Sequence, residues 1–272
     1  MSADVERFER ILVVGCGNMG GAMLQGWLAG GMPPSRITVA DPGMREAPAG
    51  VTLVSQVPQE TFDAVLLGVK PQGLDGVAAH VAESVGPDTV LLSILAGVEL
   101  DTLASRFPVN GGIVRIMPNL AAAIGKSPMA LAERGLDQAG RDAVVSLLGS
   151  LGTPEWLADE ALFDAVTALS GCGPAFVYRF IDALAAGAVE LGVEAGQAQR
   201  LALATVEGAG LLARSSPHAP GELARRVASP GGSTQAGLDV LDEGSALSRL
   251  VASAMQAAER RSAEMGREAR GA

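Results

Sequence analysis

The sequence predicts an α/β fold in which a doubly wound parallel sheet comes first and an all-α region follows. An apolar run at residues 11–14 stops on a glycine-rich turn, as a buried parallel strand does. Strand and helix patterns then alternate as far as residue 157, and no strand-like apolar run follows residue 158. We therefore expect one domain over residues 1–158 and a helical domain over residues 159–272.

Composition restricts the class of protein and its partners. The 272 residues are 48% hydrophobic and 18% charged, which is typical of a globular chain rather than a disordered one. The net charge of -10, without a cluster of Lys and Arg, argues against nucleic acid and anionic membranes as partners. No metal site is expected, because Cys16, Cys172, His80 and His218 each lack a neighbouring metal-ligand residue.

Residues 11–35 carry no charged side chain, so a membrane span is one interpretation of this stretch. Asn18, Gln25 and recurrent glycines interrupt the stretch, and a pair of prolines ends it, so a strand, a turn and a helix fit it better. Residues 1–10 mix acidic and basic side chains, unlike the positive leader of a signal peptide. We expect a cytoplasmic protein.

The first turn has the spacing of a dinucleotide-binding motif. Residues 15–20, GCGNMG, match G-x-G-x-x-G between a predicted strand and a predicted helix at 19–30. Gly15 permits the tight turn, Gly17 lets a pyrophosphate approach the backbone, and Gly20 lets the helix lie close to the strand. The positive end of the helix favours the anion. The first domain is therefore predicted to be a Rossmann-type domain that binds a dinucleotide.

Asp41 ends the second predicted strand, residues 36–41, about 20 residues beyond the glycine turn. A carboxylate in this place bonds the adenosine ribose of NADH and repels the 2′-phosphate of NADPH. Arg45 leaves the opposite preference open. The alternative is that Asp41 only begins the turn Asp41-Pro42-Gly43.

The other elements of the first domain follow in order. Further strands are predicted at 51–54, 64–69, 89–95, 112–117 and 152–157, with a helix at 136–150. Lys70 follows the strand at 64–69, at the edge of the sheet where ligands bind. A structural role for this lysine is an equal alternative. Pro71 is predicted to begin the next helix.

The second domain consists of predicted helices at 159–191, 195–214, 220–227, 235–241 and 245–264. The first helix should be broken or kinked at residues 171–174, where Pro174 lacks an amide hydrogen. Residues 161–189 are apolar on most faces, so they have to be buried. Because one domain of this size cannot surround them easily, we expect a helical dimer interface.

Residues 229–234, SPGGST, are the candidate substrate site. Hydroxyl residues and two glycines precede a predicted helix here, so several amide N–H groups would point at one place. Such a turn binds a carboxylate or phosphate without a basic side chain. The alternative is an ordinary helix cap formed by Ser233 or Thr234.

Together these motifs resemble the pyrroline-5-carboxylate reductase family. The resemblance covers nearly the whole chain and rests on six blocks in the same order: GCGNMG at 15–20, VKPQ at 69–72, AGV at 96–98, MPN at 117–119, SGCGPAFV at 170–177 and SPGGST at 229–234. It implies a helical domain interlocked with that of a partner subunit, in a higher assembly such as a decamer of five dimers. It also implies an active site where the nucleotide domain of one subunit meets helices of the dimer.

The resemblance implies a reaction and a set of site residues. The reaction is hydride transfer from NADPH or NADH to the C=N carbon of 1-pyrroline-5-carboxylate, which gives L-proline. The expected catalytic residue is Thr234, whose hydroxyl would bond the ring nitrogen. The expected substrate-binding residues are Ser229, Gly232, Ser233 and Thr234. The cofactor contacts expected from the resemblance and from the glycine motif are Val14, Gly15, Cys16, Gly17, Asn18, Met19, Gly20, Asp41, Val69, Lys70, Pro71, Ile94, Leu95, Ala96 and Asn119.

Some positions depart from the family pattern. Cys172 and Leu120 stand where hydroxyl residues are common, and Arg226 could add a charge near the substrate. Two other functions remain open: a different NAD(P)-dependent reductase of the hydroxyacid dehydrogenase type, and a non-catalytic NAD-binding regulatory protein. Substrate screening with reduced nicotinamide would separate them.

Overall fold

The computed structural model describes residues 7–271, with side chains described as far as Arg267. The chain forms two compact units. One contains the chain up to Gly171 together with the residues from Ala258 onward, and the other is Cys172–Ala257. The sequence predicts a boundary at residue 158, whereas packing assigns residues 159–171 to the first unit, because Phe163 is buried in its core.

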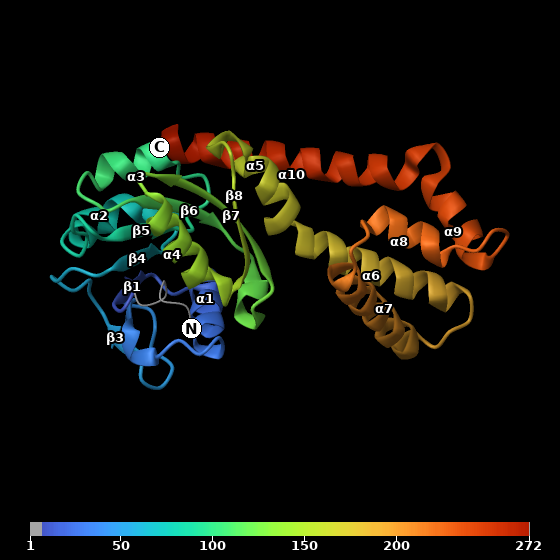
Figure 1. Cartoon of the computed structure of the whole chain (residues 1–272), viewed down its shortest axis with the longest axis horizontal. Helices are drawn as coiled ribbons and strands as arrows, with labels where there is room; N and C mark the ends of the chain where they lie inside the picture. The colour runs from blue at the N-terminus through green and yellow to red at the C-terminus, as the bar shows by residue number, and fades with distance from the viewer. Residues whose placement is uncertain (1–6, 272) are drawn as a thin grey trace. The chain divides into compact units, whose positions relative to one another are not determined.

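The first unit contains an eight-stranded sheet in the order β3-β2-β1-β4-β5-β6-β7-β8 (Figure 1). Its strands are β1 (Ile11–Val14), β2 (Ile37–Ala40), β3 (Thr52–Val54), β4 (Ala64–Leu67), β5 (Val90–Ser93), β6 (Ile113–Met117), β7 (Ser127–Arg134) and β8 (Gly152–Trp156). β1 pairs in parallel with both β2 and β4, so the strand order reverses beside β1. The carboxyl ends of strands at such a reversal are where ligands bind in doubly wound sheets.

The predicted fold class is confirmed, with one strand that the sequence did not reveal. β7 pairs antiparallel with β6 and parallel with β8, so the sheet is parallel except at one pair. The sequence of β7, SPMALAER, contains Pro, Ala and Glu, which are rare in strands. Pairing with two neighbouring strands therefore decides its conformation.

Helices cover both faces of the sheet. α1 (Asn18–Ala29) and α4 (Gln138–Gly149) cover one face, and α2 (Leu74–Ala82) and α3 (Leu100–Arg106) cover the other (Figure 1). All four residues of β1 are apolar because Ile11 and Val13 pack in one core cluster and Leu12 and Val14 in the other.

The second unit is helical. It consists of α6 (Gly173–Glu190), α7 (Ala195–Ser215), α8 (Pro220–Val227), α9 (Ser233–Asp242) and the first part of α10 (Ala246–Gly271). The predicted break before Pro174 is confirmed: α5 (Phe163–Val166) is followed by a π-helical turn, Thr167–Gly171, and α6 begins afresh at Gly173. A π-turn is a common cause of such a kink.

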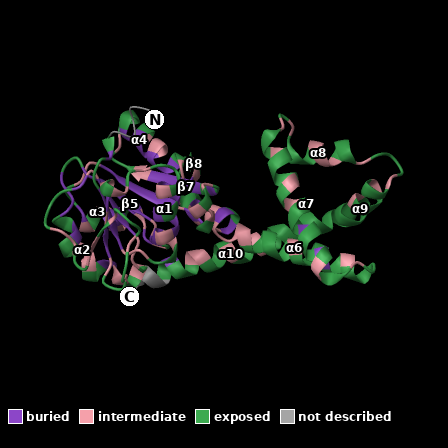
Figure 2. Cartoon of the chain, turned by 90° about the horizontal axis from the view of Figure 1, so that it is seen from below, coloured by how far each residue is buried: buried purple, intermediate pink, exposed green. Residues whose placement is uncertain are grey.

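The second unit leaves most of its apolar side chains exposed. Figure 2 shows buried residues concentrated in the sheet of the first unit, whereas α6–α9 are mostly exposed. On α6, Ala185 is buried, whereas Phe176, Tyr178 and Phe180 are exposed. Within the described chain, one helical stretch, Glu160–Glu190, is long and apolar enough to cross a membrane by length and composition. Core helices of soluble proteins that are mostly buried meet the same criterion, whereas 17% of the most apolar window of this stretch is buried within the single chain.

Candidate functional site

The glycine turn after β1 has the geometry that its motif predicts. Gly15 has φ +83°, a conformation that favours glycine. A Cβ on Gly20 would lie 2.8 Å from the carbonyl oxygen of Gly15, and a Cβ on Gly68 would clash with the same oxygen. A Cβ on Gly17, in contrast, would meet no atom within 4 Å. Gly15, Gly20 and Gly68 thus shape the turn, and the space beside Gly17 fits a pyrophosphate.

Asp41 connects the end of β2 to the glycine turn. Its Oδ2 accepts a hydrogen bond of 2.7 Å from the backbone N–H of Cys16, and its Oδ1 accepts one of 2.8 Å from the N–H of Gly43. Asp41 therefore begins its own turn, and it also holds the glycine turn from 25 residues away. Burial and, to a smaller extent, the negative charge of Asp41 raise the pKa of the Cys16 thiol. Cys16 is accordingly a neutral thiol at physiological pH, and it is unsuited to act as a nucleophile.

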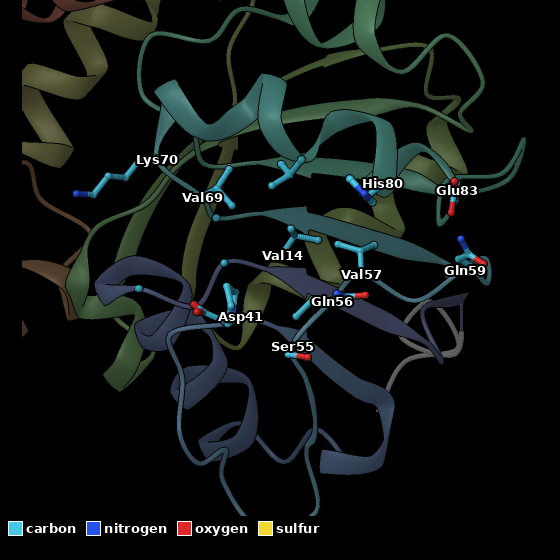
Figure 3. A pocket seen from close by; sticks show the side chains of 16 residues that line it. Val14, Asp41, Ser55, Gln56, Val57, Gln59, Val69, Lys70, His80 and Glu83 are labelled. Carbon is cyan, nitrogen blue, oxygen red and sulfur yellow. The ribbon is translucent and has the colours of Figure 1, made fainter.

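A cavity of about 830 Å³ opens beside this turn, at the carboxyl ends of β1, β2 and β4 (Figure 3). Six of the residues predicted to bind a cofactor line it: Val14, Gly15, Gly17, Asp41, Val69 and Lys70. The Lys70 side chain is exposed and extends away from Asp41 (Figure 3). The predicted residues from three separate strand ends thus come together in one hollow.

The opposite wall of the cavity was not predicted. It is formed by the loop after β3, by α2 and by the residue that caps the carboxyl end of α2: Ser55, Gln56, Val57, Gln59, Val77, His80 and Glu83. No motif marks these residues. The strand order could have indicated these residues, because β3 and β4 lie on either side of the pair β2 and β1. The segments that follow β3 and β4 therefore border the same cavity.

Other predicted cofactor residues do not line the cavity. These are Cys16, Asn18, Met19, Gly20, Pro71, Ile94, Leu95, Ala96 and Asn119. Leu95 is 2% exposed and packs in the core. The neighbouring Gly97, with φ +74°, is approached by α10: its Cβ would lie 2.9 Å from Cα of Gly266. Cofactor contact stays a prediction for all of these residues.

Both polar atoms of the Asn119 side chain form hydrogen bonds within the protein. Its Nδ2 donates to the carbonyl of Ser170 at 2.9 Å, and its Oδ1 accepts the N–H of Ala121 at 2.9 Å. Its own N–H donates to Oγ of Ser127 at 2.9 Å. Asn119 thus ties β6 to the π-helical turn, which is a structural role.

The segment 229–234 lies in the second unit and leads into α9. Gly231 has φ +73°, and the N–H of Gly232 donates to the carbonyl of Ser229 at 2.9 Å. Gly232 is the N-cap of α9, and no side chain caps the helix. The alternative in which Ser233 or Thr234 is the cap is therefore wrong.

Ser233 and Thr234 instead begin the helix, with exposed side chains. The first amide N–H groups of a helix have no partner within it, so α9 presents backbone donors together with two hydroxyls. This arrangement suits a carboxylate ligand. In the part of the chain that the structure describes, no group of three or more His, Cys, Asp and Glu residues is placed to hold a metal ion.

Comparison with known proteins places these features in a family. Residues 160–265 match the family model for pyrroline-5-carboxylate reductase dimerisation, and residues 10–97 match the model for NADP oxidoreductase, coenzyme F420-dependent. The chain is 35% identical over 264 residues to a pyrroline-5-carboxylate reductase of Pseudomonas aeruginosa, covering 94% of this chain and 96% of that protein. It is 37% identical over 241 residues to that of Aquifex aeolicus, covering 86% and 89%.

Solved structures agree. A pyrroline-5-carboxylate reductase from Coxiella burnetii matches with a TM-score of 0.88 and 28% identity, covering 94% of this chain and 98% of that one. A pyrroline carboxylate reductase of Plasmodium falciparum with NADP bound matches with a TM-score of 0.80 and 25% identity over the same shares of the two chains.

Proposed function

This chain belongs to the pyrroline-5-carboxylate reductase family, and we propose that it reduces the C=N bond of 1-pyrroline-5-carboxylate to L-proline with NADH or NADPH. The observation that carries the proposal is the cavity at the ends of β1, β2 and β4, where the glycine turn and Asp41 meet in a chain that matches this family nearly end to end. When bound, the reduced nicotinamide supplies the hydride.

Each part of the cofactor site has a physical task. The open space at Gly17 and the amino-terminal end of α1 suit the pyrophosphate. The carboxylate of Asp41 suits the adenosine ribose, and Val57, Val69 and Val77 supply apolar walls for the adenine ring. Residues 94–96, at the end of β5, are proposed to adjoin the nicotinamide.

The substrate is a small ring that bears a carboxylate and an imine. The substrate carboxylate is proposed to bind at the start of α9. The amide N–H groups of Ser233 and Thr234 would hold it, together with Ser229 and Gly232. In the iminium form, the ring N–H donates to the hydroxyl of Thr234. Hydride addition to the carbon leaves the former C=N electron pair on nitrogen and gives the ring amine. Fixing the two rings in this geometry can contribute several kcal/mol to the rate.

Oligomerisation follows from the dimerisation domain that the chain contains. We propose a homodimer formed by the helical domains and assembled to a decamer in the cytoplasm, without nucleic acid or membrane partners. The exposed Phe176, Tyr178 and Phe180 of α6 support this, because a soluble protein rarely exposes an apolar surface without a partner. The net charge of -10 disfavours anionic partners.

The test is oxidation of reduced nicotinamide by the purified protein. With 1-pyrroline-5-carboxylate we expect oxidation of NADH or NADPH and formation of L-proline in equal amount, with no turnover of 2-oxo acids. Turnover of a 2-oxo acid instead would favour a hydroxyacid dehydrogenase. Binding of NADH without any hydride transfer would favour a regulatory protein.

A further inference from the structure

The two oxygens of the Asp41 carboxylate are fixed by backbone groups of two different segments. Oδ2 accepts the N–H of Cys16 in the glycine turn at 2.7 Å, and Oδ1 accepts the N–H of Gly43 in the following loop at 2.8 Å. Turning the side chain away would leave both amide groups without this acceptor, which is unfavourable in a partly buried site. The carboxylate is therefore a fixed part of the cavity wall.

An ionised carboxylate also has acceptor capacity left for a ligand. Its two oxygens offer about four acceptor positions, and the two backbone N–H groups use two of them. Ribose hydroxyls can donate to the remaining positions. A 2′-phosphate offers only acceptor oxygens and carries negative charge, so it would meet Asp41 with repulsion and without a hydrogen bond.

The cavity holds little positive charge to offset that repulsion. Among the described residues that line it, Lys70 is the only lysine or arginine. Lys70 lies in the loop that follows β4, and its side chain extends away from Asp41 (Figure 3). Arg45, the residue that left the opposite preference open in the sequence, is exposed and does not line the cavity.

We infer that Asp41 makes this protein selective for NADH over NADPH. The inference rests on the proposed cofactor site. It differs from what the two comparisons suggest, because the amino-terminal family model is named for an NADP oxidoreductase and the Plasmodium falciparum relative has NADP bound. Asp41 acts as a specificity residue: it favours the free 2′-hydroxyl and excludes the 2′-phosphate.

The test measures nucleotide binding by the full-length protein without substrate, by titration calorimetry with NADH and with NADPH. A fixed like charge beside a phosphate weakens binding, so we expect NADH to bind about 100-fold more tightly than NADPH. Asp41→Ser removes the charge and should reduce the ratio to less than about tenfold, mainly by improving NADPH binding. Equal binding of the two nucleotides by the unmodified protein would overturn the inference, as would an unchanged ratio in Asp41→Ser.

Two control variants separate the local effect of Asp41 from net charge. Glu46→Gln removes one negative charge from the same loop, at an exposed residue outside the cavity, and should leave the ratio of the two affinities unchanged. Arg45→Ala should also leave it unchanged. A tenfold loss of NADPH binding in Arg45→Ala would show that this arginine holds the 2′-phosphate, contrary to the inference. Circular dichroism establishes that Asp41→Ser is folded.

The binding measurement also separates this inference from the proposed function. Selective NADH binding without reduction of 1-pyrroline-5-carboxylate would reject the proposed reaction and keep the role of Asp41. Reduction of 1-pyrroline-5-carboxylate with a preference for NADPH would keep the reaction and reject the role of Asp41.

Discussion

Nη1 of Arg115 lies 2.8 Å from Oε1 of Glu160, and the same carboxylate oxygen accepts the backbone N–H of Leu100 at 3.0 Å. Arg115 is on β6, with 6% of its side chain exposed, and its guanidinium lies 4.1 Å from the centre of the Phe163 ring. Glu160 belongs to the segment after β8. The ion pair between the buried Arg115 and Glu160 therefore connects the sheet to the turns that follow β8, its last strand.

Glu160→Ala should destabilise the first unit strongly, because it leaves the Arg115 charge buried without a carboxylate. We expect the free energy of unfolding to fall by about 2 to 4 kcal/mol, measured by urea denaturation. Adding Arg115→Met removes the stranded charge, so the double variant should lose less than the sum of the single variants. Glu60→Ala is the control, since its pair with Arg10 is half exposed and should contribute less than about 1 kcal/mol. Similar losses in Glu60→Ala and Glu160→Ala would contradict this account.

Two glycines of the same turn should respond differently to a single methyl group. Gly17→Ala meets no atom and requires no positive φ, so the unfolding temperature should stay the same, whereas dinucleotide affinity should fall at least about tenfold. Gly20→Ala places its Cβ 2.8 Å from the carbonyl of Gly15, so it should lower the unfolding temperature as well. Thermal melts without ligand and NADH titrations distinguish the two. A destabilised Gly17→Ala variant would contradict the assignment of its space to the ligand.

Thr234→Ala should lower kcat by about 10- to 100-fold while NADH still binds with unchanged affinity, because the hydroxyl is proposed to bond the ring nitrogen and not the cofactor. Thr234→Ser retains the hydroxyl and should restore most of the activity. Ser215→Ala removes a hydroxyl that donates to the carbonyl of Leu212 within α7, and it serves as the matched control. Unchanged steady-state kinetics in Thr234→Ala would remove this residue from the mechanism.

Glu194 caps α7 through both of its carboxylate oxygens, which accept the N–H groups of Gly196 at 2.8 Å and Gln197 at 2.7 Å. These hydrogen bonds lower the pKa of Glu194 from its ordinary value of 4.5. A carboxyl group whose pKa is lower in the folded protein stabilises it above the unfolded value, and this contribution is lost as the pH falls through the folded value.

Glu194→Ala should therefore lower the unfolding temperature at pH 7, and the difference from the unmodified protein should shrink as the pH falls below 4.5. Thermal melts across this range measure it. Glu190→Gln removes an exposed charge from the end of the preceding helix and should show no comparable pH dependence. A difference that stays constant with pH would mean that the ionised cap is not the cause.

The sequence alone determined the features that depend on neighbouring residues. Gly15 and Gly20 are required by the shape of one turn, and Gly17 was predicted from the space that a pyrophosphate needs. The break near Pro174 was predicted from its missing amide hydrogen. Helical periodicity shows which faces of a helix are apolar, and α6 is apolar on most of its faces. The sequence therefore predicted that α6 needs a partner to cover it, and its large apolar side chains are exposed in the single chain. Each of these inferences needs only local geometry.

Tertiary structure alone decided the features in which distant segments meet. Four of these features join residues that are far apart in the chain. They are the antiparallel pairing of β7, the second wall of the cavity, the contact of Gly97 with Gly266, and the buried pair of Arg115 and Glu160. Asp41 combines both cases: its spacing from the glycine turn predicted a ribose contact, whereas only the fold showed that backbone amides hold both of its oxygens in place. Such contacts depend on the pairing order of the strands, which no local pattern of residues encodes.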